Sequence, residues 1–136
     1  MDGTNDRQSG AGMIIGGIIW ALGGIIVIVA VEAPARGRVG INSVVGMRFG
    51  PMLLSDRAWT AGHRAARQYT WLAGLAMIVG GLIVVLGSLT DEQGVLVFLV
   101  STLVLGLFTT LAALRAHRAA SAELVAEQSE WGEVPS

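Results

Sequence analysis

The hydrophobic positions of this 136-residue chain gather in three long runs that contain no charged residue. The runs cover residues 11–31, 71–89 and 94–114. At a helical rise of 1.5 Å per residue, a run of about 21 residues spans about 31 Å, close to the thickness of the hydrocarbon core of a bilayer. We therefore predict an all-α, polytopic membrane protein with three transmembrane helices.

Four more polar segments flank and separate the predicted helices. They are a leader at 1–10, a loop with an interfacial helix at 32–70, an external turn at 90–93 and an acidic tail at 115–136. The short turn makes the second and third runs a helical hairpin, and Thr90 or Asp91 can cap the third helix. The tail is expected to be a frayed helical extension, because residues 119–136 contain acids but no base. The acids are Glu123, Glu127, Glu130 and Glu133.

Composition supports the membrane assignment. Hydrophobic residues make up 53% of the chain and charged residues only 14%, with a mean hydropathy of +0.64, which is unlike a water-soluble domain. The first run is expected to be retained instead of cleaved as a signal peptide. It is longer than a signal core, and the leader carries Asp2 and Asp6 beside the single Arg7. The chain has no cysteine, which excludes disulfides and thiolate metal sites.

The arginines predict the orientation, because short loops rich in positive charge stay in the cytoplasm. The loop at 32–70 holds six arginines and two more follow the third run, whereas the leader holds one and the turn at 90–93 none. We therefore expect the N-terminus outside and the C-terminus in the cytoplasm, with the protein in a plasma membrane. The expected partner is the lipid bilayer, and no nucleic-acid partner is expected.

The cytoplasmic loop is too apolar to lie free in solvent. Around a turn at Gly50 and Pro51 it carries Val44, Val45, Met47, Phe49, Met52, Leu53 and Leu54. We expect this part to lie on the cytoplasmic face of the bilayer. Ser55 can cap a helix that starts at Asp56 and continues into the second run, which would place Tyr69 and Trp71 at the interface as anchors.

The loop also contains a spaced set of polar, glycine and aromatic residues, N-x3-G-x-R-x6-S-D-x2-W-x3-H-R. Its members are Asn42, Gly46, Arg48, Ser55, Asp56, Trp59 and His63. This set resembles the SdpI family of bacterial membrane proteins, which typically read N-x3-G-x-R-T-x2-T-x2-S-[ED]-x2-W-x3-[NH]. Phe49 and Met52 depart from the pattern because they stand where the family usually has threonine. The resemblance covers roughly residues 35–90, and since longer relatives have about six crossings, the chain resembles a short member.

Each motif residue has a structural and a functional interpretation. Trp59 and His63 lie four apart on one helical face with Ala66 and Thr70, and they form either a recognition surface or an interfacial anchor. Arg48 has a guanidinium fork that suits a lipid headgroup, a partner's acid or Asp56. Gly46 is expected to provide a turn with positive φ, and Asn42 a side chain that bonds nearby backbone.

Catalysis, metal binding and ion-coupled transport are not expected. Ser55, Asp56 and His63 could suggest a triad, but consecutive helical residues diverge and His63 lies two turns away. The two histidines, His63 and His117, lack neighbouring carboxylates, so no metal or other cofactor is predicted. No ionisable side chain lies within the three runs, whereas ion-coupled carriers place such groups there. Trp20, near the middle of the first run, is expected to face protein.

Small residues recur at helix-packing spacing in the apolar runs. The pairs are Gly12 with Gly16, Gly17 with Ala21, and Ala76 with Gly80. Packing among the three helices explains them, and self-association into a homo-oligomer is the alternative.

The resemblance implies immunity to a secreted antimicrobial peptide, with sequestration of a cytoplasmic regulator as a further role. A peptide toxin or another membrane protein would then be the partner. A different class of function stays open, in which the chain is a structural or accessory subunit of an envelope complex. A small-solute permease is the third hypothesis, because an uncharged pore needs no ionisable group.

Overall fold

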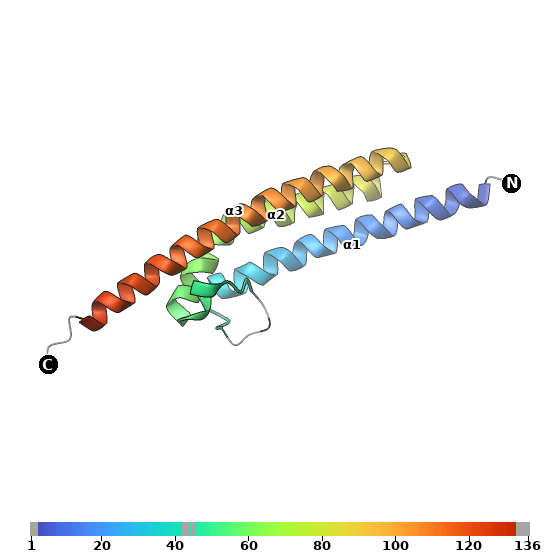
Figure 1. The fold of residues 1–136 in the computed structure, drawn as a ribbon. Helices are drawn as coiled ribbons and strands as arrows, with labels where there is room; N and C mark the ends of the chain where they lie inside the picture. Colours follow the sequence, from blue (N-terminus) through green and yellow to red (C-terminus); the bar gives the residue numbers. More distant parts are fainter. Residues whose placement is uncertain (1–2, 42–43, 45, 133–136) are drawn as a thin grey trace. The chain divides into compact units, whose positions relative to one another are not determined.

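A computed structural model describes residues 3–41, 44 and 46–132 and is helical without strands over this part of the chain. Three long helices carry the fold, α1 (Gly3–Ala35), α2 (Asp56–Leu86) and α3 (Asp91–Gly132), and a short 3-10 helix, η1 (Gly50–Leu53), lies in the loop before α2 (Figure 1). Each long helix is apolar and long enough to cross a membrane. The predicted class, an all-α membrane protein with three transmembrane helices, is confirmed.

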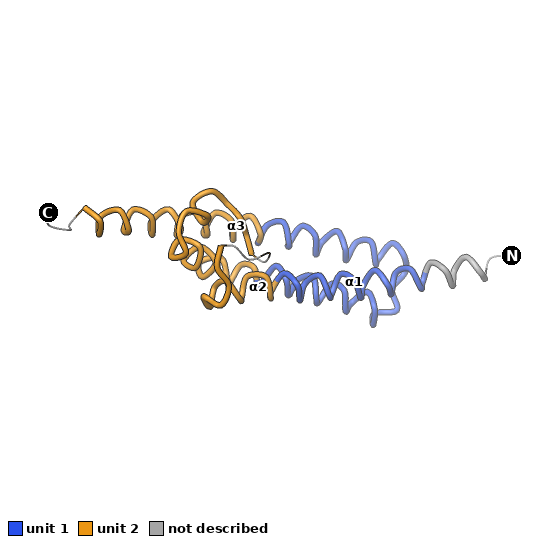
Figure 2. The backbone as a smooth tube through the Cα atoms, turned by 90° about the horizontal axis from the view of Figure 1, so that it is seen from below, with its two compact units in different colours: residues 1–27, 71–108 blue, residues 28–70, 109–136 orange. Residues whose placement is uncertain are grey.

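The chain forms two compact units (Figure 2). Unit 1 comprises Met1–Val27 and Trp71–Phe108, and unit 2 comprises Ile28–Thr70 and Thr109–Ser136. Unit 1 therefore holds most of the apolar runs, whereas unit 2 holds the loop, the motif and the tail. The two units are built on different contacts.

The helix ends differ from the sequence-based boundaries for identifiable reasons. The turn between α2 and α3 lies at 87–90, earlier than the predicted 90–93, because Thr90 and Gln93 form a capping box. The Gln93 amide donates to Thr90 Oγ1 (3.4 Å), and the Thr90 amide donates to Gln93 Oε1 (3.1 Å). At the end of α1, Gly37 has φ +67°, and the Arg38 amide donates to the Ala33 carbonyl (3.1 Å) in a Schellman motif.

Unit 1 is packed through glycine at the contact between α1 and α2. A Cβ atom placed on Gly17 would lie 2.8 Å from the carbonyl oxygen of Gly81, and one placed on Gly24 would meet the carbonyl oxygen of Gly74. A Cβ on Gly81 would in turn lie 3.0 Å from Ala21 Cβ. Only glycine lets the two backbones approach this closely. Gly17 and Ala21 thus lie at a helix contact, as the sequence predicts, whereas Gly24, Gly74 and Gly81 were not foreseen.

The remaining residues that the sequence predicts to pack between helices have different surroundings in the structure. Gly80 faces α3, where a Cβ would lie 2.9 Å from Ser101 Cβ, and Ala76 lines an apolar groove between α2 and α3 beside it. Gly16 lies near the ring of Phe98, from which a Cβ would be 3.5 Å away. Among the described residues, no heavy atom apart from the adjoining backbone and chain neighbours in α1 lies within 4 Å of a Cβ placed on Gly12. The expectation that Gly12 contributes to packing is therefore not met, because this position of α1 faces outward.

Trp20 and Ser101 of unit 1 find hydrogen-bond partners inside the helix bundle. Trp20 Nε1 donates to Ser101 Oγ (3.0 Å), and the Trp20 ring packs edge-on against Phe98 at a centroid distance of 5.9 Å. Ser101 Oγ donates to the Phe98 carbonyl of its own helix (3.1 Å). The prediction that Trp20 faces protein is confirmed. The outward positions of α1 and α3 are instead large and apolar, among them Ile15, Ile19, Ile26, Leu96, Leu103 and Leu107.

Candidate functional site: the motif loop and the start of α2

Unit 2 has a core in which alanines of α2 and α3 surround a few large side chains. The buried members are Val31, Met52, Ala58, Trp59, Ala66, Ala112, Ala116 and Ala120. The part of α2 in this unit, residues 56–70, precedes the uncharged stretch of the helix and lies outside the predicted crossing. The motif therefore belongs to a packed layer of loop and helix, in which each polar group needs a partner.

Ser55 starts α2 as its N-cap. The Ser55 hydroxyl accepts a hydrogen bond from the Ala58 amide (3.0 Å), and the Ser55 carbonyl accepts one from the Trp59 amide (2.9 Å). Asp56 occupies the first helical position, where its negative charge is favourable beside the positive end of the helix dipole. The predicted cap and the predicted unbroken helix from Asp56 into the apolar run are both confirmed.

Trp59 and His63 lie on the buried face of α2. Both are 0% exposed, and Ala66 and Thr70 continue the same buried face. The shared face is as predicted, but the recognition surface and the interfacial anchor are both wrong for the Trp59 and His63 side chains. Val39, Gly46 and Met47 lie against the two rings, which are therefore closed to lipid and to a partner.

Two hydrogen bonds tie the loop to the buried rings. Trp59 Nε1 donates to the Val39 carbonyl (2.9 Å), and the Met47 amide donates to His63 Nε2 (2.9 Å). The rings of Trp59 and His63 contact each other at a centroid distance of 4.3 Å. We call Val39, Gly46, Met47, Trp59 and His63 the motif clasp, because the two side chains fix the backbone of the loop on either side of residues 42–45.

Gly46 completes the motif clasp. Its φ of +121° confirms the predicted positive value and belongs to a region that side chains with a Cβ rarely adopt. A Cβ at this position would also lie 2.7 Å from His63 Nε2 and 2.8 Å from Trp59 Cζ2. Glycine is thus required twice here, once for the backbone and once for the space that the rings occupy.

The hydrogen bonds of His63 define its charge state. Because Nε2 accepts from the Met47 amide, the ring hydrogen of the neutral form lies on Nδ1, which is 2.9 Å from the Trp59 carbonyl and donates to it. Burial lowers the pKa of His63, and the hydrogen bond to the Trp59 carbonyl opposes that shift without cancelling it. His63 is therefore a neutral, fully bonded structural residue rather than a proton carrier.

The two departures from the family pattern occupy different environments. Met52 is fully buried, and its side chain packs against Gly62, where a Cβ would lie 2.7 Å from Met52 Cε. Phe49 precedes η1 at the N-cap position and makes no side-chain cap, whereas a threonine hydroxyl could accept a backbone hydrogen bond there. Van der Waals packing therefore replaces hydroxyl chemistry at position 52 of this chain.

The other motif residues lie at the surface or outside the described chain. Arg48 and Asp56 are exposed, and Ser55 is partly exposed. Asp56 approaches the loop, since a Cβ on Gly40 would lie 3.2 Å from its Oδ1. Asn42 lies outside the described residues, as does Val45 of the apolar loop. The structure brings Gly46, Trp59 and His63 into one contact and leaves Arg48 and Asp56 as the solvent-facing part of the motif.

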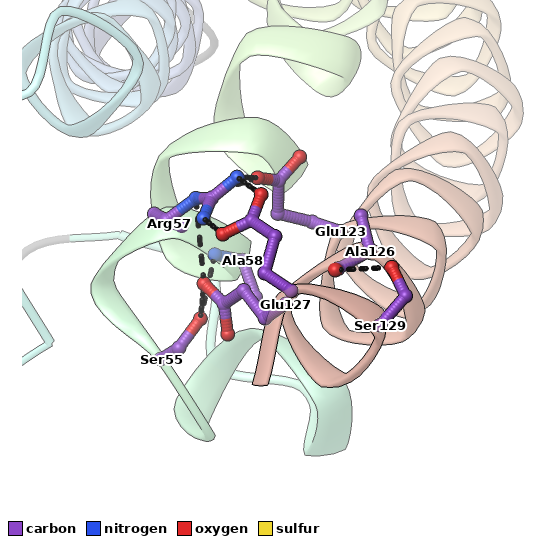
Figure 3. Close-up of polar contacts among 8 residues, drawn as sticks. Ser55, Arg57, Ala58, Glu123, Ala126, Glu127 and Ser129 are labelled. Atoms are coloured by element: carbon purple, nitrogen blue, oxygen red, sulfur yellow. Dashed lines mark hydrogen bonds and ion pairs between the residues drawn. The ribbon is translucent and has the colours of Figure 1, made fainter. Parts of the chain in front are cut away.

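A charged cluster next to Ser55 was missed in the sequence. Arg57 of α2 contacts three carboxylates of α3, with distances of 2.9 Å to Glu123, 3.6 Å to Glu127 and 2.8 Å to Glu130 (Figure 3). Ser55 Oγ also donates to Glu127 Oε1 (2.9 Å). We call Arg57, Glu123, Glu127 and Glu130 the ion cluster. The signal that could have revealed it is the i, i+4, i+7 spacing of the three acids, which places them on one helical face.

The ion cluster corrects the picture of the acidic tail. α3 continues to Gly132, and its acids up to Glu130 are paired with α2, so the described part of the tail is an ordered helix instead of a frayed one. The hydrogen bond from Arg57, together with its charge, lowers the pKa of the Glu130 carboxyl. Glu133 lies outside the described residues.

Two further contacts join α1 and α3 to α2 within unit 2. Glu32 at the end of α1 accepts a forked pair of hydrogen bonds from Arg67, 2.8 Å from Nε to Oε2 and 2.7 Å from Nη2 to Oε1, and it also binds Arg36 (2.6 Å). The guanidinium of Arg115 lies over the Tyr69 ring, 5.8 Å from its centroid. Tyr69 thus packs against the core of unit 2, whereas Trp71 is partly exposed, and its role as an interfacial anchor stays a prediction.

Three apolar helices of membrane-spanning length, together with a loop fastened to the buried start of α2, define a multi-pass α-helical membrane protein. The sequence model of the SdpI/YfhL protein family matches residues 38–113, more than half of the chain, and covers the motif loop, α2 and most of the apolar part of α3. The chain therefore belongs to the SdpI/YfhL family. No curated protein and no solved structure matches it significantly.

Proposed function

We propose that this protein lies in the bacterial plasma membrane and protects that membrane from a secreted antimicrobial peptide. The observation that carries the proposal is membership of the SdpI/YfhL family over residues 38–113, and the contact among the motif residues Gly46, Trp59 and His63 supports it. Immunity to such a peptide is what the resemblance to the SdpI family implies. The absence of ionisable groups from the apolar runs agrees with a protective role better than with ion-coupled transport.

Arg48 and Asp56 are the motif residues through which a partner would be recognised. Trp59 and His63 are fully buried and hold the loop, so their contribution is to shape the surface. Arg48 lies on that shaped loop and is exposed, and its planar fork suits a carboxylate or phosphate in a geometry that lysine cannot reproduce. The proposed contact is therefore made by the solvent-facing part of the motif.

The proposal includes an orientation, with the N-terminus outside and unit 2 with its arginines in the cytoplasm. A reporter fused after residue 136 should be active in the cytoplasm, and one inserted at 87–90 should be active outside. The opposite pattern would contradict this orientation.

The experiment for function is a protection assay. A sensitive bacterial strain carrying either this protein or an empty vector is challenged with a panel of secreted, membrane-permeabilising peptides, and membrane depolarisation is recorded. We expect protection against a member of the panel, with loss of protection in Arg48→Lys at unchanged abundance. Equal depolarisation in both strains across the panel, with the protein present in the membrane, would contradict the proposal.

The alternative of an accessory subunit has no support from the glycine faces that suggested it. Gly17 and Gly80 make their close contacts within unit 1. Those residues therefore do not call for a second protein, and self-association stays a prediction of the sequence.

A further inference from the structure

The contacts of α3 change in character along unit 2. Up to Ala120 the helix is held by buried alanines, among them Ala112 and Ala116, which pack in the core around Trp59. Beyond Ala120, Leu124 is packed against that core, whereas Val125 is 67% exposed and Trp131 is 80% exposed. The last three turns of the helix therefore gain little from apolar burial.

Beyond Ala120, polar contacts to the first turn of α2 hold the helix in place of apolar ones. All three acids of the ion cluster reach the single guanidinium of Arg57, and Glu127 also accepts the hydrogen bond of the Ser55 hydroxyl, so that five side chains fasten the helix at one place (Figure 3). The Arg57 side chain is about half exposed, as are parts of its partners, so these ion pairs are open to screening by salt. A segment with few buried apolar contacts and exposed ionic ones is the kind that opens locally.

We propose that residues 121–132 form a strap that the ion cluster holds closed over the first turn of α2, and that opens while the rest of unit 2 stays folded. In the closed state, the carboxylates of the strap occupy the Arg57 guanidinium and the Ser55 hydroxyl. In the open state, both groups face solution beside Asp56 and Arg64, which line the hollow next to Arg57. The strap lies beyond the family match, which ends at residue 113. It nevertheless contacts the motif residue Ser55. A segment outside the family match therefore covers one edge of the family motif.

A pair of spin labels measures the opening in the full-length protein. Because the chain has no cysteine, Gln68→Cys on α2 and Gln128→Cys on the strap provide two unique and exposed labelling sites. At about 0.1 M salt, where the Debye length is about 10 Å, we expect one narrow distance distribution. At about 1 M salt, where it is about 3 Å, we expect a second, broader population at longer distance.

Variants on both sides of the ion cluster should give the same result. Arg57→Ala should produce the long-distance population at low salt, and so should the triple change of Glu123, Glu127 and Glu130 to glutamine, which keeps the shape of the side chains. Arg57→Lys, which keeps the charge but loses the fork, should be intermediate. Arg67→Ala is the matched control, because it removes a forked arginine of the same helix that binds Glu32 instead of the strap.

A second label pair separates opening from unfolding. Gln68→Cys with His117→Cys joins α2 to α3 before the strap begins, and its distance should stay unchanged in every variant. Cleavage by a Glu-specific protease within the strap should become about fivefold faster or more in Arg57→Ala, because cleavage follows the population of the open form.

Two results would overturn the proposal. The first is an unchanged Gln68 to Gln128 distance in both Arg57→Ala and the triple glutamine variant, together with an unchanged cleavage rate in Arg57→Ala. The second is a change of both label distances together, which would mean that the strap does not open independently of the unit 2 core.

Discussion

Glycine has opposite roles in the two units of this protein. In unit 1, Gly17, Gly24 and Gly81 sit in regular helix, and the missing side chain lets the backbones of α1 and α2 touch. In unit 2, Gly46 lies outside any helix, at φ +121°, and leaves room for the rings of Trp59 and His63. Unit 1 is therefore held by the close approach of helices whose outer faces are apolar, whereas unit 2 combines an alanine-lined core with specific polar contacts of Trp59, His63 and Arg57.

The largest expected effect is the introduction of a bulky side chain at the helix contact of unit 1. Gly81→Leu should destabilise the protein by about 3 kcal/mol or more, the upper end of the range for overpacking, because backbone atoms of Gly17 and Ala21 stand in the way and cannot move aside cheaply. Thermal unfolding in detergent measures the loss. Gly12→Leu is the matched control on an open face of α1, and an equal loss in both variants would contradict the assigned contact.

The next effect tests the glycine of unit 2. Gly46→Ala combines a disfavoured positive φ with a methyl group that meets His63 Nε2, so a loss of about 2 kcal/mol is expected. Gly50→Ala is the control in the same loop, because the described residues leave open space there and Gly50 does not have a positive φ. If the two alanine variants have the same unfolding temperature, the motif clasp does not constrain the loop.

A smaller effect is expected from the helix cap of α2. Ser55→Ala removes the oxygen that accepts from the Ala58 amide, which should cost about 1 kcal/mol of stability. Ser55→Asn keeps an acceptor at the N-cap and should recover most of that loss. Equal stability of the alanine variant and the unchanged protein in detergent would argue against the cap.

The smallest effect is a dependence of stability on pH. Because the pKa of His63 is lower in the folded protein than its usual 6.5, the unfolded chain binds more protons between the two values. The stability contributed by neutral His63 is complete above about pH 6.5 and declines as the pH falls below it. His63→Asn, which the family pattern allows, should keep a hydrogen-bond acceptor for the Met47 amide and remove this decline. An identical pH profile in the variant would show that His63 does not cause it.

The fold could be predicted from sequence because its signals are local. Uncharged runs of membrane length predict three helices, and the spacing of Trp59 and His63 predicts their common face. The environment of that face could not be predicted, because it depends on which segment folds over it. Hydrogen bonds from the rings to the backbone of residues 39 and 47 are contacts that the residue identities of the loop do not reveal. These bonds change the interpretation of Trp59 and His63 from an exposed recognition surface to a buried support of the loop.

The ion cluster was missed for a related reason. The sequence places Glu123, Glu127 and Glu130 in an acidic tail that is expected to fray, because each charge is counted within its own segment. Their partner, Arg57, lies 66 residues or more earlier in the chain and was counted among the arginines that set orientation. Spacing along one helix indicates which face is acidic, but only the packing of α2 against α3 in unit 2 identifies what that face binds.

The central claim is that the motif residues Trp59 and His63 support the loop from inside, and the tautomer of His63 tests it most directly. The chain has two histidines, and the exposed His117 serves as an internal reference in proton–nitrogen correlation spectra of the labelled imidazoles. The account predicts that His63 is neutral at pH 7, with hydrogen on Nδ1 and an unprotonated Nε2 that accepts from the Met47 amide. Hydrogen on Nε2, or a His63 that is protonated on both ring nitrogens at pH 7, would contradict it.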